Sequence, residues 1–115
     1  MVEKSYQQRG KLSFQRKDKL MARYIALIKF TEKGAKGIKK STGRARSFDK
    51  AAARAGVKIE GQYWTLGAYD GVLIISSDQE KKALRCLTEL ASYGAVQTQT
   101  MPAFTDQEFD AIVRK

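Results

Sequence analysis

Hydroxyl groups and one carboxylate gather around a glycine near the middle of the chain. They belong to Tyr63, Thr65, Tyr69 and Asp70. A two-residue turn at Gly67-Ala68 sets Thr65 opposite Asp70, with Tyr63 on their side of the hairpin and Tyr69 on the other. A carboxylate beside hydroxyls can orient a small ligand, or act as a base when it is desolvated. The structural alternative is that Asp70 bonds the backbone or Thr65, while Tyr63 fills a dimer interface.

A second candidate is an anion site at the start of a predicted helix. In Ser41-Thr42-Gly43-Arg44 the free backbone N–H groups and the Arg44 side chain can hold an anion, although a simple helix cap has the same pattern. The single cysteine, Cys86, is one helical turn from Ala83 and Leu90, which favours a core position over a reactive thiol. Arg44 is therefore the anion-binding candidate.

The chain has no histidine and one cysteine among its 115 residues. Ser-His and Cys-His nucleophile pairs, His-ligated haem and zinc sites built on several Cys or His ligands are therefore excluded. No motif predicts a metal or a cofactor, and no catalytic residue can be assigned. An internal disulfide cannot form and the apolar runs are far too short to span a membrane, so we expect a cytoplasmic protein without a membrane partner.

Positive charge is concentrated in the first half of the chain. The formal charge is +10, and residues 21–56 carry ten Lys or Arg against two acids. This basic half can attract nucleic acid, but a solvated surface gives the same composition. Residues 1–20 fit no firm period, so we expect a basic, disordered N-terminal extension followed by one domain over residues 21–115.

Strands and helices alternate along residues 21–115. Arg23–Phe30, Val57–Leu66, Tyr69–Ser76 and Ala95–Met101 are rich in apolar and β-branched residues, which predicts four strands. A helix over about Arg44–Ala55 has a predicted buried stripe of Phe48, Ala52 and Ala55, with Arg46, Lys50 and Arg54 exposed. Ser77 and Glu80 predict a capping box before a second helix, and Thr105 and Glu108 predict one before a terminal helix.

This order is β-α-β-β-α-β, which predicts an α+β, ferredoxin-like fold with an antiparallel sheet in the order 4-1-3-2. Right-handed crossovers put both helices on one face. The first and third strands are apolar on both sides, and the run Val72 to Ile75 has no polar residue. We therefore expect the other face to be covered by a second copy of the chain, giving a homodimer.

Three stretches carry a family resemblance: Tyr24-Ile-Ala-Leu-Ile-Lys-Phe-Thr, Tyr63-Trp-Thr-Leu-Gly-Ala-Tyr-Asp and Thr98-Gln-Thr-Met-Pro-Ala-Phe-Thr. Over about residues 22–113 the chain resembles the GYD domain family, whose Gly-x-Tyr-Asp is present as Gly67, Tyr69 and Asp70. The resemblance implies a dimeric α/β barrel, in which two ferredoxin-like sheets meet face to face. The family has no assigned activity, so the resemblance implies no catalytic residue.

Three functions compete at this point. The first is a homodimeric module that binds a small molecule in the cleft between sheet and partner, or regulates a partner. The second is a cofactor-free enzyme of the dimeric α/β-barrel type, an oxygenase or isomerase, which needs a water-excluding cleft around Asp70 or a tyrosine. The third is a weak nucleic-acid binder that uses the basic half, although the third strand lacks the aromatic residues on which bases stack.

Overall fold

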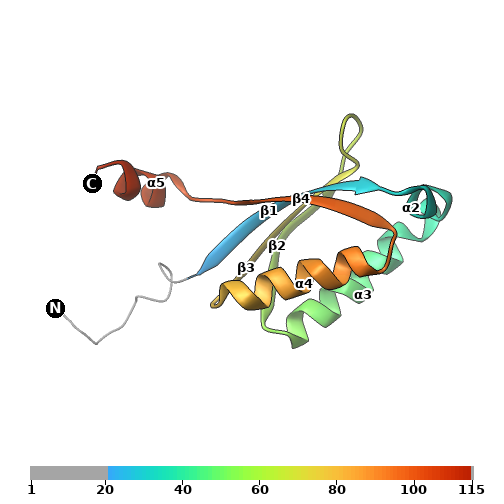
Figure 1. Ribbon diagram of the computed structural model, residues 1–115, viewed down its shortest axis with the longest axis horizontal. Coiled ribbons are helices and arrows are strands. Elements are labelled where there is room, and N and C mark those ends of the chain that lie inside the picture. Colours follow the sequence, from blue (N-terminus) through green and yellow to red (C-terminus); the bar gives the residue numbers. More distant parts are fainter. Residues whose placement is uncertain (1–20, 115) are drawn as a thin grey trace.

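The computed structural model describes residues 21–114, to which all structural statements below refer. The predicted extension over residues 1–20 lies outside this range. Figure 1 shows four strands, two long helices against them and a terminal helix set apart. In chain order the elements are β1 (Ala22–Phe30), α2 (Glu32–Lys36), the 3₁₀ turn η1 (Ile38–Lys40), α3 (Ser41–Arg54), β2 (Val57–Trp64), β3 (Gly71–Ser77), α4 (Glu80–Ser92), β4 (Val96–Pro102) and α5 (Asp106–Val113).

The strands form one antiparallel sheet in the order β2-β3-β1-β4, which confirms the predicted order read from its other edge. α3 and α4 lie side by side on one face of the sheet (Figure 1). This is the predicted α+β, ferredoxin-like arrangement. The helices follow right-handed crossovers, so they must share one face and leave the other without a layer of its own.

The hydrophobic core lies between the two helices and the sheet. The sheet contributes alternate residues of its strands, because successive side chains of a strand point to opposite faces. From β1 and β3 these include Tyr24, Ala26, Leu73 and Ile75. The helices add Phe48, Ala52, Ala83, Cys86 and Leu87. Cys86 is buried, as its helical spacing predicted.

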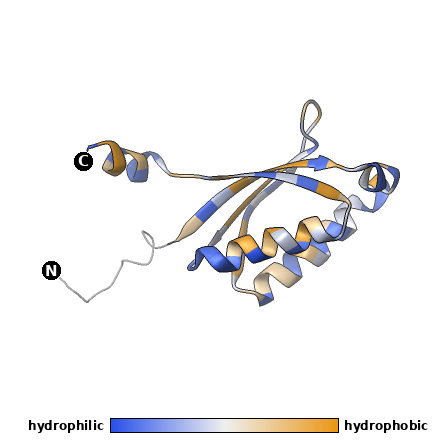
Figure 2. Cartoon of the chain, in the orientation of Figure 1, coloured by the Kyte–Doolittle hydropathy of each residue, from blue (hydrophilic) through white to orange (hydrophobic). Residues whose placement is uncertain are grey.

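The other face of the sheet, the open face, is apolar at its centre. Ile25 and Leu27 of β1 stand beside Ile74 and Val72 of β3. These four side chains are only half-buried, because within residues 21–114 no helix covers them. Figure 2 shows hydrophobic positions along these central strands and in α5. The alternation that places one apolar set in the core thus leaves a second apolar set facing outward.

The hairpin differs from the prediction in two ways. β2 ends at Trp64 and β3 begins at Gly71, so residues 65–70 form a loop longer than the expected two-residue turn. Gly67 has φ of 137°, in the range that favours glycine. Tyr63 pairs with Val72, but the register between β2 and β3 shifts between Ile59 and Gly61, which leaves Glu60 as a β-bulge. Strict alternation from Tyr63 along β2 predicts Ile59 on the same face as Tyr63, and this prediction is wrong, because the bulge turns Ile59 to the helix-covered face, where it packs against the core.

The helix boundaries also correct the sequence prediction. α3 begins at Ser41, before the predicted start at about Arg44, and Ala55, which was predicted in the buried stripe, is exposed beyond its end. Before α4 the predicted capping box does not form, since the N-cap is Gln79 and makes no side-chain cap bond. Glu80 instead accepts a hydrogen bond from the hydroxyl of Tyr24, 2.8 Å away. The contact with β1 competes with the local cap.

α5 extends beyond the end of the sheet (Figure 1). Thr105 and Glu108 form the predicted capping box, but no residue of α5 is buried. The exposed fractions of Phe109, Ile112 and Val113 are all above one half. The Cα radius of gyration is 16.8 Å, against roughly 13 Å expected for a compact domain of about 100 residues. α5 therefore presents apolar side chains that its own domain does not cover.

Candidate functional site

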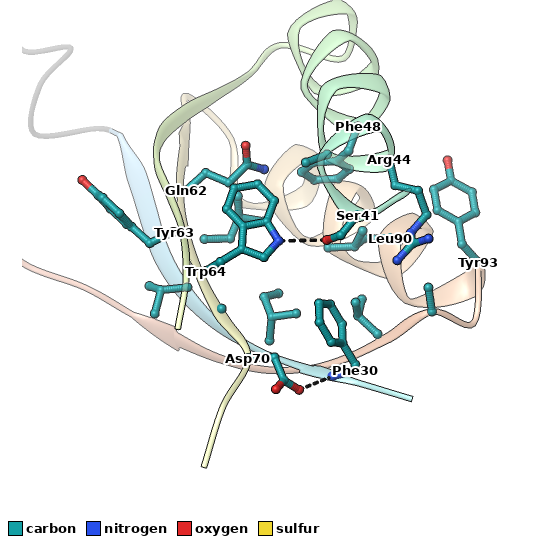
Figure 3. A pocket seen from close by; sticks show the side chains of 17 residues that line it. Phe30, Ser41, Arg44, Phe48, Gln62, Tyr63, Trp64, Asp70, Leu90 and Tyr93 are labelled. Carbon is teal, nitrogen blue, oxygen red and sulfur yellow. Dashed lines mark hydrogen bonds between the residues drawn. The ribbon is translucent and has the colours of Figure 1, made fainter. Parts of the chain in front are cut away.

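A hollow lies between the N-terminal half of α3, the C-terminal end of α4 and the sheet (Figure 3). It has a volume of about 100 Å³. Its floor is formed by β1 and β3, with Ile28, Gly71 and Leu73, and Phe30, Phe48 and Leu90 make much of the apolar wall. The hollow is therefore on the helix-covered face. The sequence placed its ligand cleft on the opposite side, between the open face and a partner.

Arg44 is the cationic side chain of this pocket. It descends from α3 toward the side where Leu90 and Tyr93 lie (Figure 3). Its Nη1 donates to the carbonyl oxygen of Gly37 at 3.0 Å, which ties the guanidinium to the turn before η1. Its Nη2 is buried and has no hydrogen-bond partner among the described residues. A buried guanidinium nitrogen without an acceptor costs free energy, so this atom marks a place where an acceptor would stabilise the site.

Trp64 closes the pocket against the start of α3. Its indole N–H donates to the hydroxyl of Ser41 at 2.8 Å. Ser41 is the first residue of α3, and its backbone N–H is already bonded to Ile38 in η1. The N-cap of α3 is Lys40, and within residues 21–114 no side chain makes a cap hydrogen bond there. The alternative that this segment is a simple helix cap is therefore wrong. The hydroxyl holds an aromatic wall of the pocket instead.

Asp70 is engaged by the backbone on three sides. Its carboxylate accepts from the N–H of Phe30 at 2.7 Å, and its own N–H donates to the carbonyl of Ile28 at 2.7 Å. Its carbonyl accepts from the N–H of Thr65 at 3.0 Å. The residue thus fixes the 65–70 loop to the end of β1, at the rim of the pocket (Figure 3). This contact corresponds to the structural alternative weighed for Asp70.

The other predicted ligand residues are not brought together. Thr65 donates its hydroxyl hydrogen to the carbonyl of Tyr69 within the loop. The hydroxyl of Tyr69 donates to Gln99, which stands beside Leu27 on the open face. Tyr63 points away from the hollow in Figure 3 and is 62% exposed. The longer loop is the reason, because it ends the strand pairing that was to align these side chains.

Several pocket residues were absent from the candidates. Trp64, Phe30 and Tyr93 line the hollow but were assigned no site role. Trp64 was detectable from the sequence, because it follows Tyr63 in the strand and therefore faces the opposite side of the sheet. Phe30 and Tyr93 stand at the ends of β1 and α4, which only the tertiary structure brings to one cavity.

Three pKa shifts are resolved among the described residues, and all lie outside this pocket. Burial, followed by the hydrogen bond to Glu80, raises the pKa of Tyr24. Burial also raises the pKa of the Cys86 thiol, with Glu89 adding to it. The backbone hydrogen bond from Thr105, followed by the side-chain hydrogen bond from Arg23, lowers the pKa of Glu108. A raised thiol pKa lowers the fraction of thiolate at neutral pH, which agrees with a structural role for Cys86.

Among residues 21–114 no helix has both the length and the apolar character that crossing a bilayer requires.

Comparison with solved structures supports the fold. A crystal structure of MtbAldR superposes with a TM-score of 0.53 at 12% identity, over 85% of this chain. The chain spans 63% of the length of that structure. At this level of identity the likeness concerns the fold alone.

Sequence comparison identifies the family. A Thermus thermophilus protein named "Glutamine synthetase and cystathionine beta-lyase binding protein" is 32% identical over 84 residues, which cover 72% of this chain and 88% of that protein. The GYD domain family matches residues 24–113, from within β1 to the end of α5. The signature residues Gly67, Tyr69 and Asp70 lie in the loop between β2 and β3, and Asp70 holds this loop to β1 by hydrogen bonds. The chain therefore belongs to the GYD domain family.

Proposed function

We propose that this chain is a regulatory binding module, a homodimer that attaches to a metabolic enzyme. The relative named for binding glutamine synthetase and cystathionine beta-lyase carries the proposal, because the match covers 88% of that protein. Little of the relative lies outside the domain that the two chains share. A cytoplasmic location fits this proposal, since the single cysteine offers no internal disulfide.

The homodimer rests on the open face. Ile25, Leu27, Val72 and Ile74 form a continuous apolar centre. A sheet that turns such a surface to water gains free energy when another apolar surface covers it, at roughly 25 cal/mol per Å² removed from water. A second copy presents the same surface, so a two-fold arrangement matches apolar to apolar. The apolar side chains of α5 extend beyond the sheet and give the second copy a further surface to cover.

The enzyme then has to bind outside the open face. The outward side of α3 carries Arg46, Lys50 and Arg54, all exposed. Lys39 and Lys40 of η1 continue this surface, which we name the basic face. Charge on a contact rim mainly accelerates association and selects partners of opposite charge. We therefore assign the basic face to an acidic patch on the enzyme.

The test measures binding of purified glutamine synthetase from the same organism to the immobilised chain. We expect saturable binding whose association rate falls about tenfold or more in Arg46→Glu/Lys50→Glu, because two attractive charges become repulsive. The matched control Lys81→Glu/Arg85→Glu changes the same number of charges on α4 and leaves the rate near that of the native chain. The nucleic-acid alternative would be favoured if the chain failed to bind the enzyme and instead bound DNA or RNA with an affinity that falls steeply as salt is added.

A further inference from the structure

The pocket between α3, α4 and the sheet contains a cation that no anion balances. Within residues 21–114 no carboxylate forms an ion pair with Arg44. Its Nη1 is held by the carbonyl of Gly37, while Nη2 is buried and unpaired. A charge taken out of water without a counter-charge destabilises the folded state. A negative group placed in the pocket beside Arg44 would offset this cost.

The rest of the pocket suits an apolar body. Phe30 and Phe48 are aromatic walls (Figure 3), and Leu90 of α4 adds a third apolar side chain. The volume of about 100 Å³ is below the ~150 Å³ of an engineered cavity that takes up benzene. The occupant must therefore be smaller than a ring that carries a carboxylate, which favours a short branched aliphatic chain.

We propose that this pocket binds a small organic carboxylate, with its apolar body between Phe30, Phe48 and Leu90 and its carboxylate on Arg44. A guanidinium forms two parallel hydrogen bonds to a carboxylate, which supplies direction as well as charge. Nη2 is shielded from solvent in this conformation. The Arg44 side chain therefore has to rotate toward the pocket to reach a ligand, and this rotation alters its hydrogen bond to Gly37. This site goes beyond the proposed enzyme binding and needs neither a second copy nor an enzyme.

Asp70 separates two sources of such a carboxylate. Its side chain stands at the pocket rim below Phe30, away from Arg44 (Figure 3). A simple organic acid would use Arg44 alone. In the amino acid of the same carbon skeleton, valine, the ammonium group is on the carbon next to the carboxylate, so it would lie beside Arg44 and away from the carboxylate of Asp70. The simple acid should therefore bind more tightly, and comparing 3-methylbutanoate with valine distinguishes the two sources.

Trp64 provides the readout, because it is the only tryptophan of the chain and it lines the pocket. The full chain is titrated at constant ionic strength with 3-methylbutanoate, with the uncharged 3-methylbutanamide and with valine, while tryptophan fluorescence is recorded. We expect a saturable change with 3-methylbutanoate and weaker binding of valine. The amide should bind at least about tenfold more weakly, because it lacks the charge that Arg44 complements.

Two variants of α3 locate the site. Arg44→Gln should weaken carboxylate binding about tenfold or more, whereas Arg85→Gln, at an exposed position of α4 outside the pocket, should leave it unchanged. Ala45→Leu should block binding by filling the hollow while Arg44 remains in place. Circular dichroism checks that each variant is folded, and if Arg44→Gln is not, the amide comparison and Ala45→Leu still decide. Equal affinity for amide and carboxylate, no saturable change with either acid, or full binding in Ala45→Leu would overturn the proposal.

Discussion

Asp70 shows how a residue with the chemistry of a base can serve the backbone. Its carboxylate meets the N–H of Phe30, and its own backbone groups meet Ile28 and Thr65. These bonds join the 65–70 loop to β1, which lies next to β3 in the sheet. The Asp of the Gly-x-Tyr-Asp signature is then a structural junction at the rim of the pocket. We expect its substitution to lower the free energy of unfolding.

Replacing Asp70 with Ala should lower the free energy of unfolding by about 2 kcal/mol, because the N–H of Phe30 loses a charged acceptor. Asp70→Asn, which keeps one acceptor oxygen, should cost less. The measurement is denaturant unfolding followed by circular dichroism. Asp110→Ala is the control, since it removes an exposed ion pair with Arg114 and should cost about 0.5 kcal/mol or less. Equal losses for Asp70→Ala and Asp110→Ala would contradict the junction role.

At the scale of elements, the sequence predicted what local patterns determine. Alternating apolar residues gave the four strands, and the doubly apolar runs placed β1 and β3 in the centre. The bulge at Glu60 and the long 65–70 loop were missed, because a Gly-Ala pair is also compatible with a tight turn and nothing local marks Glu60. The pocket was missed for a related reason. The Trp64–Ser41 bond that closes it joins residues far apart in the chain.

The attachment of α5 to β1 depends on the charge of Glu108. The hydrogen bond from the backbone of Thr105, followed by the side-chain hydrogen bond from Arg23, lowers the pKa of Glu108 below its ordinary value of 4.5. A lowered pKa contributes stability that is present above the unfolded-state value and is lost as the pH falls through the folded-state value. α5 should therefore lose its attachment to β1 as the pH falls below 4.5, before the sheet unfolds.

Amide chemical shifts of α5, followed by NMR from pH 6 to pH 3, measure this loss. In Glu108→Gln the capping box and the ion pair with Arg23 are both weakened at every pH. The α5 shifts of this variant should then be nearly independent of pH in that range. Shifts that move with pH as much in Glu108→Gln as in the native chain would show that another group controls the attachment.

At the scale of the whole molecule, two surfaces are available for binding. One is the pocket on the helix-covered face, and the other is the apolar open face with α5 beside it. The two faces belong to the same strands, since alternate residues of β1 and β3 supply both. A second copy on the open face would leave the pocket and the basic face accessible. Dimerisation, enzyme binding and ligand binding can then occur on one molecule without competing for the same surface.

Sedimentation velocity at low micromolar concentration tests the open face most directly. The native chain should sediment as a dimer, and Ile74→Arg should sediment as a folded monomer, because it places a charge at the apolar centre of the contact. Thr88→Arg adds the same charge at an exposed position of α4 and should remain a dimer. A native chain that sediments as a monomer, or an Ile74→Arg variant that stays dimeric, would contradict the claim that a second copy covers the sheet.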